Sequence, residues 1–223
     1  MPIMTELNSF WKRAKAHLHA WVIDHEIIRV LFRNFYPLSK DTYRSNQPSP
    51  DFVRKLKDKY GVNTIINLRR ADNSGAYLLE KEACDKLGIE LKVISMSSRR
   101  LPKAATILEA KKTLETAKYP ILFHCKSGAD RAGLMGVYYK YFIEKQPLED
   151  AVKQLSIRYG HFRWADTGKL DFFFDAFFEY KKQHPDIEFL EWVTSIYDRD
   201  ALDSEFKSAG WANIVVNKIL NRE

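Results

Sequence analysis

Short apolar strands alternate with helices over residues 42–124, and this alternation limits the fold more than any other feature of the chain. The strands are expected near 42–45, 62–68, 90–94 and 121–124, and the helices between them near 50–60, 76–87 and 103–117. Strands joined through helices pair in parallel, because a parallel pair needs a long crossover connection. We therefore predict an α/β fold with a central, mostly parallel sheet and helices on both faces.

The chain has 223 residues, which is enough to build one hydrophobic core. Beyond the expected sheet the pattern becomes helical, with helices near 132–144, 148–158, 170–182, 187–197 and 202–220. We predict three parts: a helical N-terminal extension over 1–40, the α/β domain over 41–185, and C-terminal helices over 186–223 that pack on the same domain.

An amphipathic stripe over residues 7–35 carries aromatic and aliphatic residues at near-helical spacing, with basic residues between them. One interpretation is that the stripe packs on the protein body. The alternative is peripheral contact with a membrane surface, because a basic helix with Trp and Phe on one face is also typical of interfacial helices. Charged residues interrupt the stripe, so it does not predict a membrane-spanning helix.

The formal net charge of +7 indicates an anionic partner. No basic cluster accompanies a nucleic-acid-binding motif, so we expect no nucleic-acid partner. Cys84 and Cys125 are too few for a disulfide framework, and the N-terminus lacks the pattern of a secretory signal. We therefore expect a cytoplasmic protein, with peripheral membrane contact as the alternative.

A cysteine and an arginine separated by five residues stand between the last expected strand and a helix. The loop reads His124-Cys125-Lys126-Ser127-Gly128-Ala129-Asp130-Arg131. Ligands of open α/β sheets bind beyond the carboxyl ends of the strands. The backbone N–H groups at a helix N-terminus form an anion site there. The loop therefore predicts a phosphate cradle.

The residues of this loop have expected roles. The N–H groups, the helix dipole and Arg131 favour the thiolate form of Cys125, which makes it the candidate nucleophile. The planar fork of Arg131 suits two phosphate oxygens. His124 is expected to brace the loop, and Gly128 to allow its tight geometry. Further substrate contacts are expected from Lys126, Ser127, Ala129 and, on a neighbouring loop, Arg69.

This loop resembles the signature His-Cys-x-x-Gly-x-x-Arg of the dual-specificity branch of the protein tyrosine phosphatase superfamily. The resemblance covers roughly residues 43–182 and includes a segment that looks like the R-S-x-Q-P of bacterial members, Tyr43-Arg44-Ser45-Asn46-Gln47-Pro48. It implies a phosphate monoester hydrolase that forms a cysteinyl-phosphate on Cys125 and uses Arg131 as the clamp. It also implies that no metal or other cofactor is needed.

Two positions depart from the family pattern. Many members have Ser or Thr directly after the Arg, where its hydroxyl helps the sulfur leave; this chain has Ala132, and Ser127 is a partial substitute. The Asp that members carry on a loop before the Cys is absent from 93–100. Asp130 is the first candidate for the general acid, because the myotubularin and Sac-type phosphoinositide phosphatases are similar at that position. Asp72 and the absence of any enzymic acid are the alternatives, and Asp130 could instead cap the following helix.

Several basic residues are expected at the same sheet edge as the loop: Lys126, Arg69, Arg70, Arg99 and Arg100. Such a pocket suits a substrate with several negative charges, such as a phospholipid head group or an inositol phosphate. A phosphotyrosine or other phosphoprotein substrate is the alternative, and the arginines could also be solvated surface charges. From another class, a catalytically impaired phosphate-binding module would account for Ala132 and the missing acid.

Loop 159–168 is expected to wall the pocket or to position the hydrolytic water, with His161, Arg163 and Asp166 as candidates. Thr167 could instead cap the next helix. Cys84 is expected in the core, and a protective disulfide with Cys125, known in some relatives, is the alternative.

Overall fold

The computed structural model describes residues 33–72 and 74–208 and contains a five-stranded sheet in the order β1-β2-β5-β3-β4. The strands are β1 (Tyr36–Pro37), β2 (Thr42–Ser45), β3 (Thr64–Asn67), β4 (Glu90–Val93) and β5 (Ile121–His124). All neighbours are parallel except β1 and β2, which confirms the predicted mostly parallel sheet. Ser45 and Asn67 both pair with His124, so β2, β3 and β5 end at one level.

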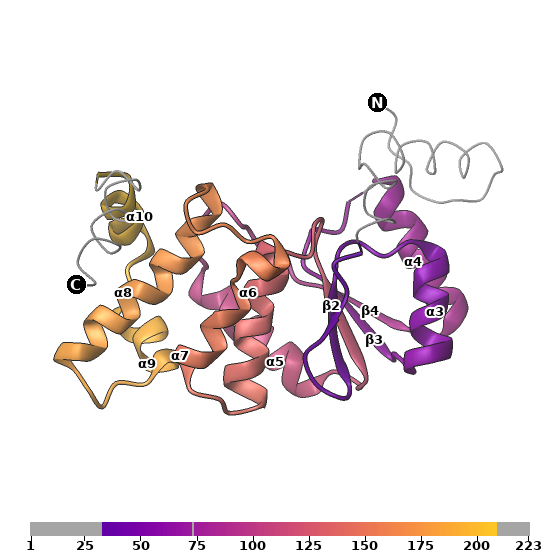
Figure 1. Ribbon diagram of the computed structural model, residues 1–223, viewed down its shortest axis with the longest axis horizontal. Coiled ribbons are helices and arrows are strands. Elements are labelled where there is room, and N and C mark those ends of the chain that lie inside the picture. Colours follow the sequence, from indigo (N-terminus) through magenta and orange to yellow (C-terminus); the bar gives the residue numbers. More distant parts are fainter. Residues whose placement is uncertain (1–32, 73, 209–223) are drawn as a thin grey trace.

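Helices cover both faces of the sheet (Figure 1). On one face lie α3 (Pro50–Tyr60) and α4 (Gly75–Leu87), and on the other lie α5 (Ala104–Thr116) and α6 (Asp130–Tyr138). The chain continues through a π-helix (Tyr139–Ile143), α7 (Leu148–Ala151), α8 (Lys169–Gln183), α9 (Phe189–Glu191), a second π-helix (Trp192–Ile196) and α10 (Arg199–Ser208). These later elements extend the layer on the α6 side.

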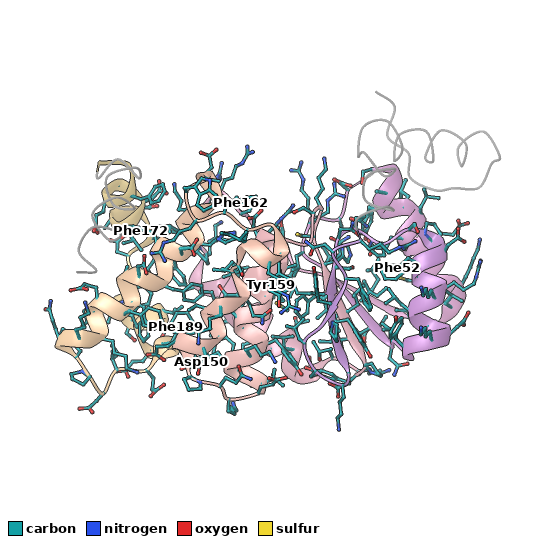
Figure 2. All side chains as sticks on the ribbon, in the orientation of Figure 1. Phe52, Asp150, Tyr159, Phe162, Phe172 and Phe189 are labelled. Carbon is teal, nitrogen blue, oxygen red and sulfur yellow. The ribbon has the colours of Figure 1, made fainter. Side chains whose placement is uncertain are left out.

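Side chains of the central strands alternate between two cores. Ile65 and Leu122 belong to the core under α3 and α4, whereas Ile66 and Phe123 belong to the larger core on the other face. The period of two along a strand produces this separation. Figure 2 shows Phe52 on α3 and Phe189 among the C-terminal helices at the other side of the sheet.

Helix ends carry the local signals expected from their sequence. The Ser49 hydroxyl accepts the N–H of Phe52 and caps α3, Pro50 occupies the first turn, and Gly61 ends the helix with φ of 64°. Ser74 caps α4 in the same way. The candidate cysteine loop differs, because α6 begins without a side-chain cap. Its first N–H groups are therefore not occupied by a capping side chain.

Two predicted helical stretches differ from the structure. Within the N-terminal extension, residues 36–37 form the edge strand β1 because Asn34 has φ of 46° and Pro37 cannot sit inside a helix. The stripe over 7–32 lies outside the described residues. The helix expected over 148–158 breaks into α7 and 3₁₀ turns, and the carbonyl of Gln154 accepts a hydrogen bond from Arg44 instead.

The C-terminal helices are integrated with the domain. Phe189, Trp192, Val193 and Leu202 belong to the same buried cluster as the residues of α6. Over 33–72 and 74–208, no helix combines the length and the apolar character needed to cross a bilayer.

Candidate active site

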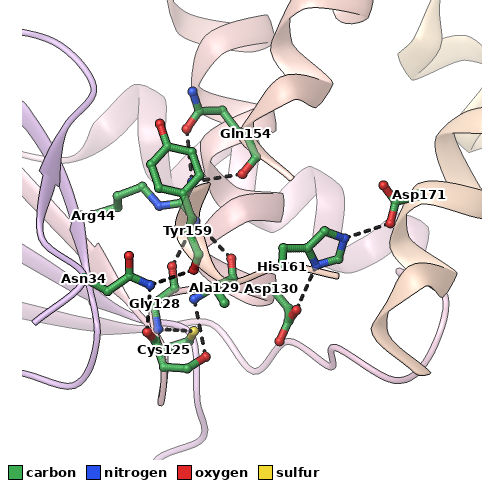
Figure 3. Close-up of polar contacts among 11 residues, drawn as sticks. Asn34, Arg44, Cys125, Gly128, Ala129, Asp130, Gln154, Tyr159, His161 and Asp171 are labelled. Carbon is green, nitrogen blue, oxygen red and sulfur yellow. Dashed lines mark hydrogen bonds and ion pairs between the residues drawn. The ribbon is translucent and has the colours of Figure 1, made fainter. Parts of the chain in front are cut away.

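The cysteine loop runs from the end of β5 to the start of α6 and folds back on its own sulfur (Figure 3). The N–H of Gly128 donates to Sγ of Cys125 over 3.2 Å, and Cys125 is 1% exposed. Gly128 has φ of 79°, and a Cβ there would lie 2.8 Å from the backbone N of Asn46 at the end of β2. Only glycine fits this combination of left-handed backbone and close approach.

Arg44 of β2 binds the backbone of the cysteine loop from the protein interior. Its side chain is fully buried, and Nη2 donates to the carbonyls of Gly128 and Ala129, each over 2.9 Å. Nη1 donates to the carbonyl and to Oε1 of Gln154, and the guanidinium lies 4.0 Å from the ring centroid of Tyr159. Burial lowers the pKa of Arg44 to about 10, which leaves it charged at neutral pH. Arg44 therefore ties β2, the loop and the segment after α7 together.

His124 is anchored by a buried carboxylate, Glu80 of α4. Nε2 of His124 lies 2.6 Å from Oε1 of Glu80, and both side chains are fully buried. The other oxygen of Glu80 accepts from the amides of Gln47 and Asn67, each over 2.8 Å. Oε1 of Gln47 in turn accepts from Arg69 over 3.0 Å. These contacts connect His124 to the edge of the cleft, and its bracing role stays a prediction.

Asn34 joins the loop to the segment that follows α7. Its amide nitrogen donates to the carbonyl of Ser127 over 2.9 Å and to that of Tyr159 over 2.8 Å (Figure 3). The two loops at this end of the sheet are thereby held together.

His161 lies between two carboxylates, Asp130 at the start of α6 and Asp171 in α8 (Figure 3). Nδ1 is 2.8 Å from Asp130 and Nε2 is 2.7 Å from Asp171, and the imidazole is almost fully buried. Burial opposes the charge, but the hydrogen bonds to Asp130 and Asp171 outweigh it and raise the pKa of His161 to about 9. His161 is therefore an imidazolium at neutral pH and links α6 to α8.

This charge predicts a specific pH dependence of stability. Because the pKa of His161 rises from 6.5 to about 9 on folding, its stabilisation is complete below pH 6.5 and is lost as the pH rises through 9. The effect is on the order of 3 kcal/mol. Urea unfolding from pH 6 to pH 10 should show this loss in the wild type and not in His161→Gln. The exposed His184 provides the control, since His184→Gln should keep the wild-type slope.

A cationic cleft of about 670 Å³ opens beside the loop. Its lining residues are Arg69, Arg70, Asp72, Ser95, Met96, Ser97, Ser98, Arg99, Arg100, Lys126 and Arg131. Six of these eleven residues are Arg or Lys, and Asp72 is the one carboxylate among the described residues that line it. Arg70, Arg99 and Arg100 form no ion pair within residues 33–72 and 74–208, and the single carboxylate of Asp72 offsets only part of the positive charge of the cleft. The cleft thus presents strong positive potential to an anion.

The comparison with known proteins places this loop and sheet in a family. A family model described as DSP-PTPase phosphatase fused to NAD+ kinase matches residues 38–167, more than half of the chain. The chain belongs to this DSP-PTPase family. The family assignment confirms the predicted membership of the protein tyrosine phosphatase superfamily. A separate comparison with curated proteins found no match to the chain.

Structures of TpbA agree with this fold. TpbA of P. aeruginosa has 21% identity and a TM-score of 0.51, over 61% of this chain and 81% of TpbA. A TpbA variant in complex with phosphotyrosine gives the same score and identity, over 61% of this chain and 82% of that chain. The catalytic core of Siw14, a PP-IP phosphatase of S. cerevisiae, has 22% identity and a TM-score of 0.44, over 80% of this chain and 93% of Siw14.

The DSP-PTPase loop brings some predicted residues to the cleft and leaves others apart. Lys126, Arg131 and Arg69 line the cleft, whereas Cys125 is buried and does not line it, and Asp130 is turned to His161. Asp130 lies in the first turn of α6 and not at its cap, which is Ala129. The Ser127 hydroxyl accepts the N–H of Ala129 over 3.4 Å.

Four further residues singled out in the sequence do not line the cleft: Ala132, Arg163, Cys84 and Thr167. Ala132 is fully buried in the larger core, and Arg163 pairs with Asp175 of α8. Cys84 lies on the buried face of α4, burial raises the pKa of its thiol, and both cysteines are free. Cys84 is therefore a core residue as predicted. No hydrogen bond from the Thr167 side chain caps α8, which begins after Gly168.

Arg44, Glu80 and Asn34 hold the site together although no role is predicted for them from the sequence. A charged residue inside a four-residue strand, as Arg44 is in β2, is the signal that could have identified it, since strands buried on both faces exclude unpaired charge. Among residues 33–72 and 74–208, no group of three or more His, Cys, Asp or Glu side chains is placed to hold a metal ion.

Proposed function

We propose that the chain is a phosphate monoester hydrolase in which Cys125 is the nucleophile. The thiolate attacks phosphorus, the bond from phosphorus to the ester oxygen breaks, and that oxygen leaves as the alcohol after it takes up a proton. Water then attacks the cysteinyl-phosphate, and the thiolate is restored as inorganic phosphate departs. The observation that carries the proposal is the loop itself, in which the N–H of Gly128 already donates to the Cys125 sulfur.

The proposed substrate carries negative charge beyond the reacting phosphate. Arg131 and Lys126 of the loop supply charge for one phosphate, and Arg70, Arg99 and Arg100 extend the positive surface of the same cleft. Arginine binds phosphate oxygens through paired N–H donors. A polyphosphorylated ester or a phospholipid head group therefore suits the cleft better than a single phosphate on a tyrosine side chain.

Phosphate release from a panel of esters tests this charge preference. We expect kcat/KM to be highest for esters with a second phosphate and to fall about tenfold in the double variant Arg70→Gln/Arg99→Gln, mainly through KM. Release from p-nitrophenyl phosphate should change little. Two exposed cations of α3 provide the matched control, Arg54→Gln/Lys55→Gln. Equal losses for singly and multiply charged esters would contradict the proposed preference, and release from none of them would indicate a phosphate-binding module.

We propose Asp72, rather than the first candidate Asp130, as the source of the proton for the leaving oxygen. Asp72 lines the cleft together with Arg131, and it is the one carboxylate there among the described residues. One of its oxygens accepts the N–H of Ser74, which holds the side chain at the start of α4. Asp130 instead accepts from the charged His161, an arrangement that orients α6.

The two aspartates are distinguished by the dependence on the leaving group. Asp72→Asn should lower kcat/KM about 10²–10⁴-fold for alkyl phosphates, which need protonation, and far less for p-nitrophenyl phosphate. Asp130→Asn should affect both esters equally. The reverse pattern, with selective loss in Asp130→Asn, would return the acid role to Asp130.

A further inference from the structure

A second, more apolar pocket of about 290 Å³ adjoins the cationic cleft. The two share Ser95, Met96, Ser97 and Arg100 in their linings. The second pocket continues over the segment before α5 and between α5 and α6, where Leu101, Pro102, Lys103, Thr106, Leu134 and Tyr138 line it. Its volume is near the lower end of the range for small-molecule pockets, which is enough for part of a ligand.

Residues beyond the family match complete the wall of this second pocket. Arg199 at the start of α10 lines it and donates from Nε to the carbonyl of Leu101 over 2.9 Å. The hydroxyl of Tyr197 donates to the carbonyl of Pro102 over 2.9 Å. These two bonds hold segment 101–102 between the second pocket and the C-terminal helices. The position of this wall of the pocket is therefore fixed by contacts with the C-terminal part of the described chain.

Tyr138 supplies an unused polar group. Its side chain is 1% exposed, and its buried hydroxyl has no hydrogen-bond partner within the described residues. A buried hydroxyl without a partner costs about 1–3 kcal/mol, so such groups normally have a partner. Tyr138 also lines the second pocket, so a ligand oxygen there would satisfy this hydroxyl once a shift of the pocket wall exposes it.

We propose that the second pocket binds the uncharged, mainly apolar part of the phosphate ester, with the hydroxyl of Tyr138 donating to an ester oxygen. The proposal rests on the proposed function and narrows its substrate class. The cationic cleft takes the phosphate, and the adjoining pocket takes an acyl-bearing alcohol. An inositol phosphate has no such apolar part and would leave the second pocket empty.

Binding of a homologous series tests this without turnover. Calorimetry on the full chain carrying Cys125→Ser would compare glycerol 3-phosphate with its 1-butanoyl and 1-hexanoyl esters, which share one charged group. We expect affinity to rise about fourfold for each methylene that enters the pocket. Thr106→Phe, which fills the pocket from α5, should abolish this rise. Thr113→Phe, two turns further along α5 and outside both pockets, should retain it.

Tyr138→Phe provides a second, independent variant. It removes only the unpartnered hydroxyl, so the free energy of unfolding should not fall, while the affinity for the acyl esters should drop about three- to tenfold. Equal affinity for glycerol 3-phosphate and its two acyl esters would overturn the proposal. Equal effects of Thr106→Phe and Thr113→Phe on the rise in affinity would also overturn it.

Different results test the proposed function and the proposed role of the second pocket. If the wild type releases no phosphate from p-nitrophenyl phosphate or from any ester of the series, the hydrolase assignment is wrong. The binding series still decides whether the second pocket recognises the acyl group.

Discussion

Replacing Cys125 with serine should lower kcat by about 10⁴-fold or more while phosphate and vanadate still bind, because the variant loses the nucleophile and keeps the backbone cradle. Cys125 is 1% exposed and its sulfur contacts the N–H of Gly128, so a hydroxyl fits the same space. Turnover of p-nitrophenyl phosphate and calorimetric titration with vanadate would measure the two effects.

Cys84 is the matched control, because it is the other of the two cysteines in the chain. It is fully buried on the opposite face of the sheet from the Cys125 cluster. Cys84→Ser should lower the free energy of unfolding and leave kcat of the folded protein unchanged. Full activity of Cys125→Ser would remove Cys125 from the mechanism.

Replacing Arg44 with methionine should lower the free energy of unfolding by about 3–5 kcal/mol. The substitution keeps much of the side-chain volume but removes all four donated hydrogen bonds to Gln154, Gly128 and Ala129. The carbonyls left behind are buried acceptors without their donor. Urea unfolding measures the loss, and phosphate affinity of the folded variant should fall with it because the cradle is no longer held.

Arg54 offers the corresponding surface control. It lies on α3, makes an exposed ion pair with Asp51, and Arg54→Met should change the free energy of unfolding by no more than about 0.5 kcal/mol. If Arg44→Met and Arg54→Met had similar effects, the central position assigned to Arg44 would be wrong.

Local pattern predicted most of the sheet and its helices. Strands such as β5 and helices such as α3 carry their own apolar period, caps and glycine ends, so their bounds follow from the residues themselves. The strand β1 was not predicted, because two residues carry no period and pair only once β2 is in place. The break after α7 was also not predicted, since it depends on the distant Arg44.

Part of the candidate site was also predictable from the sequence. The positions of Lys126, Arg131 and Arg69 beside one cleft follow from the carboxyl ends of neighbouring parallel strands. The partner of Asp130 did not follow, because His161 reaches it from a loop whose position depends on tertiary packing. The buried contacts of Glu80 with His124, Gln47 and Asn67 were also not predicted, because a Glu within a helix normally faces solvent.

In the proposed reaction, the sulfur of Cys125 forms a covalent bond to phosphorus during turnover. Rapid quenching in alkaline denaturant of the wild type mixed with a ³²P-labelled aryl phosphate, followed by peptide mapping above neutral pH, tests it most directly. We predict label on the peptide that contains Cys125, and none on the Cys84 peptide or in Cys125→Ser. Steady turnover with no label on the Cys125 peptide at any quench time, or label on another residue, would contradict the account.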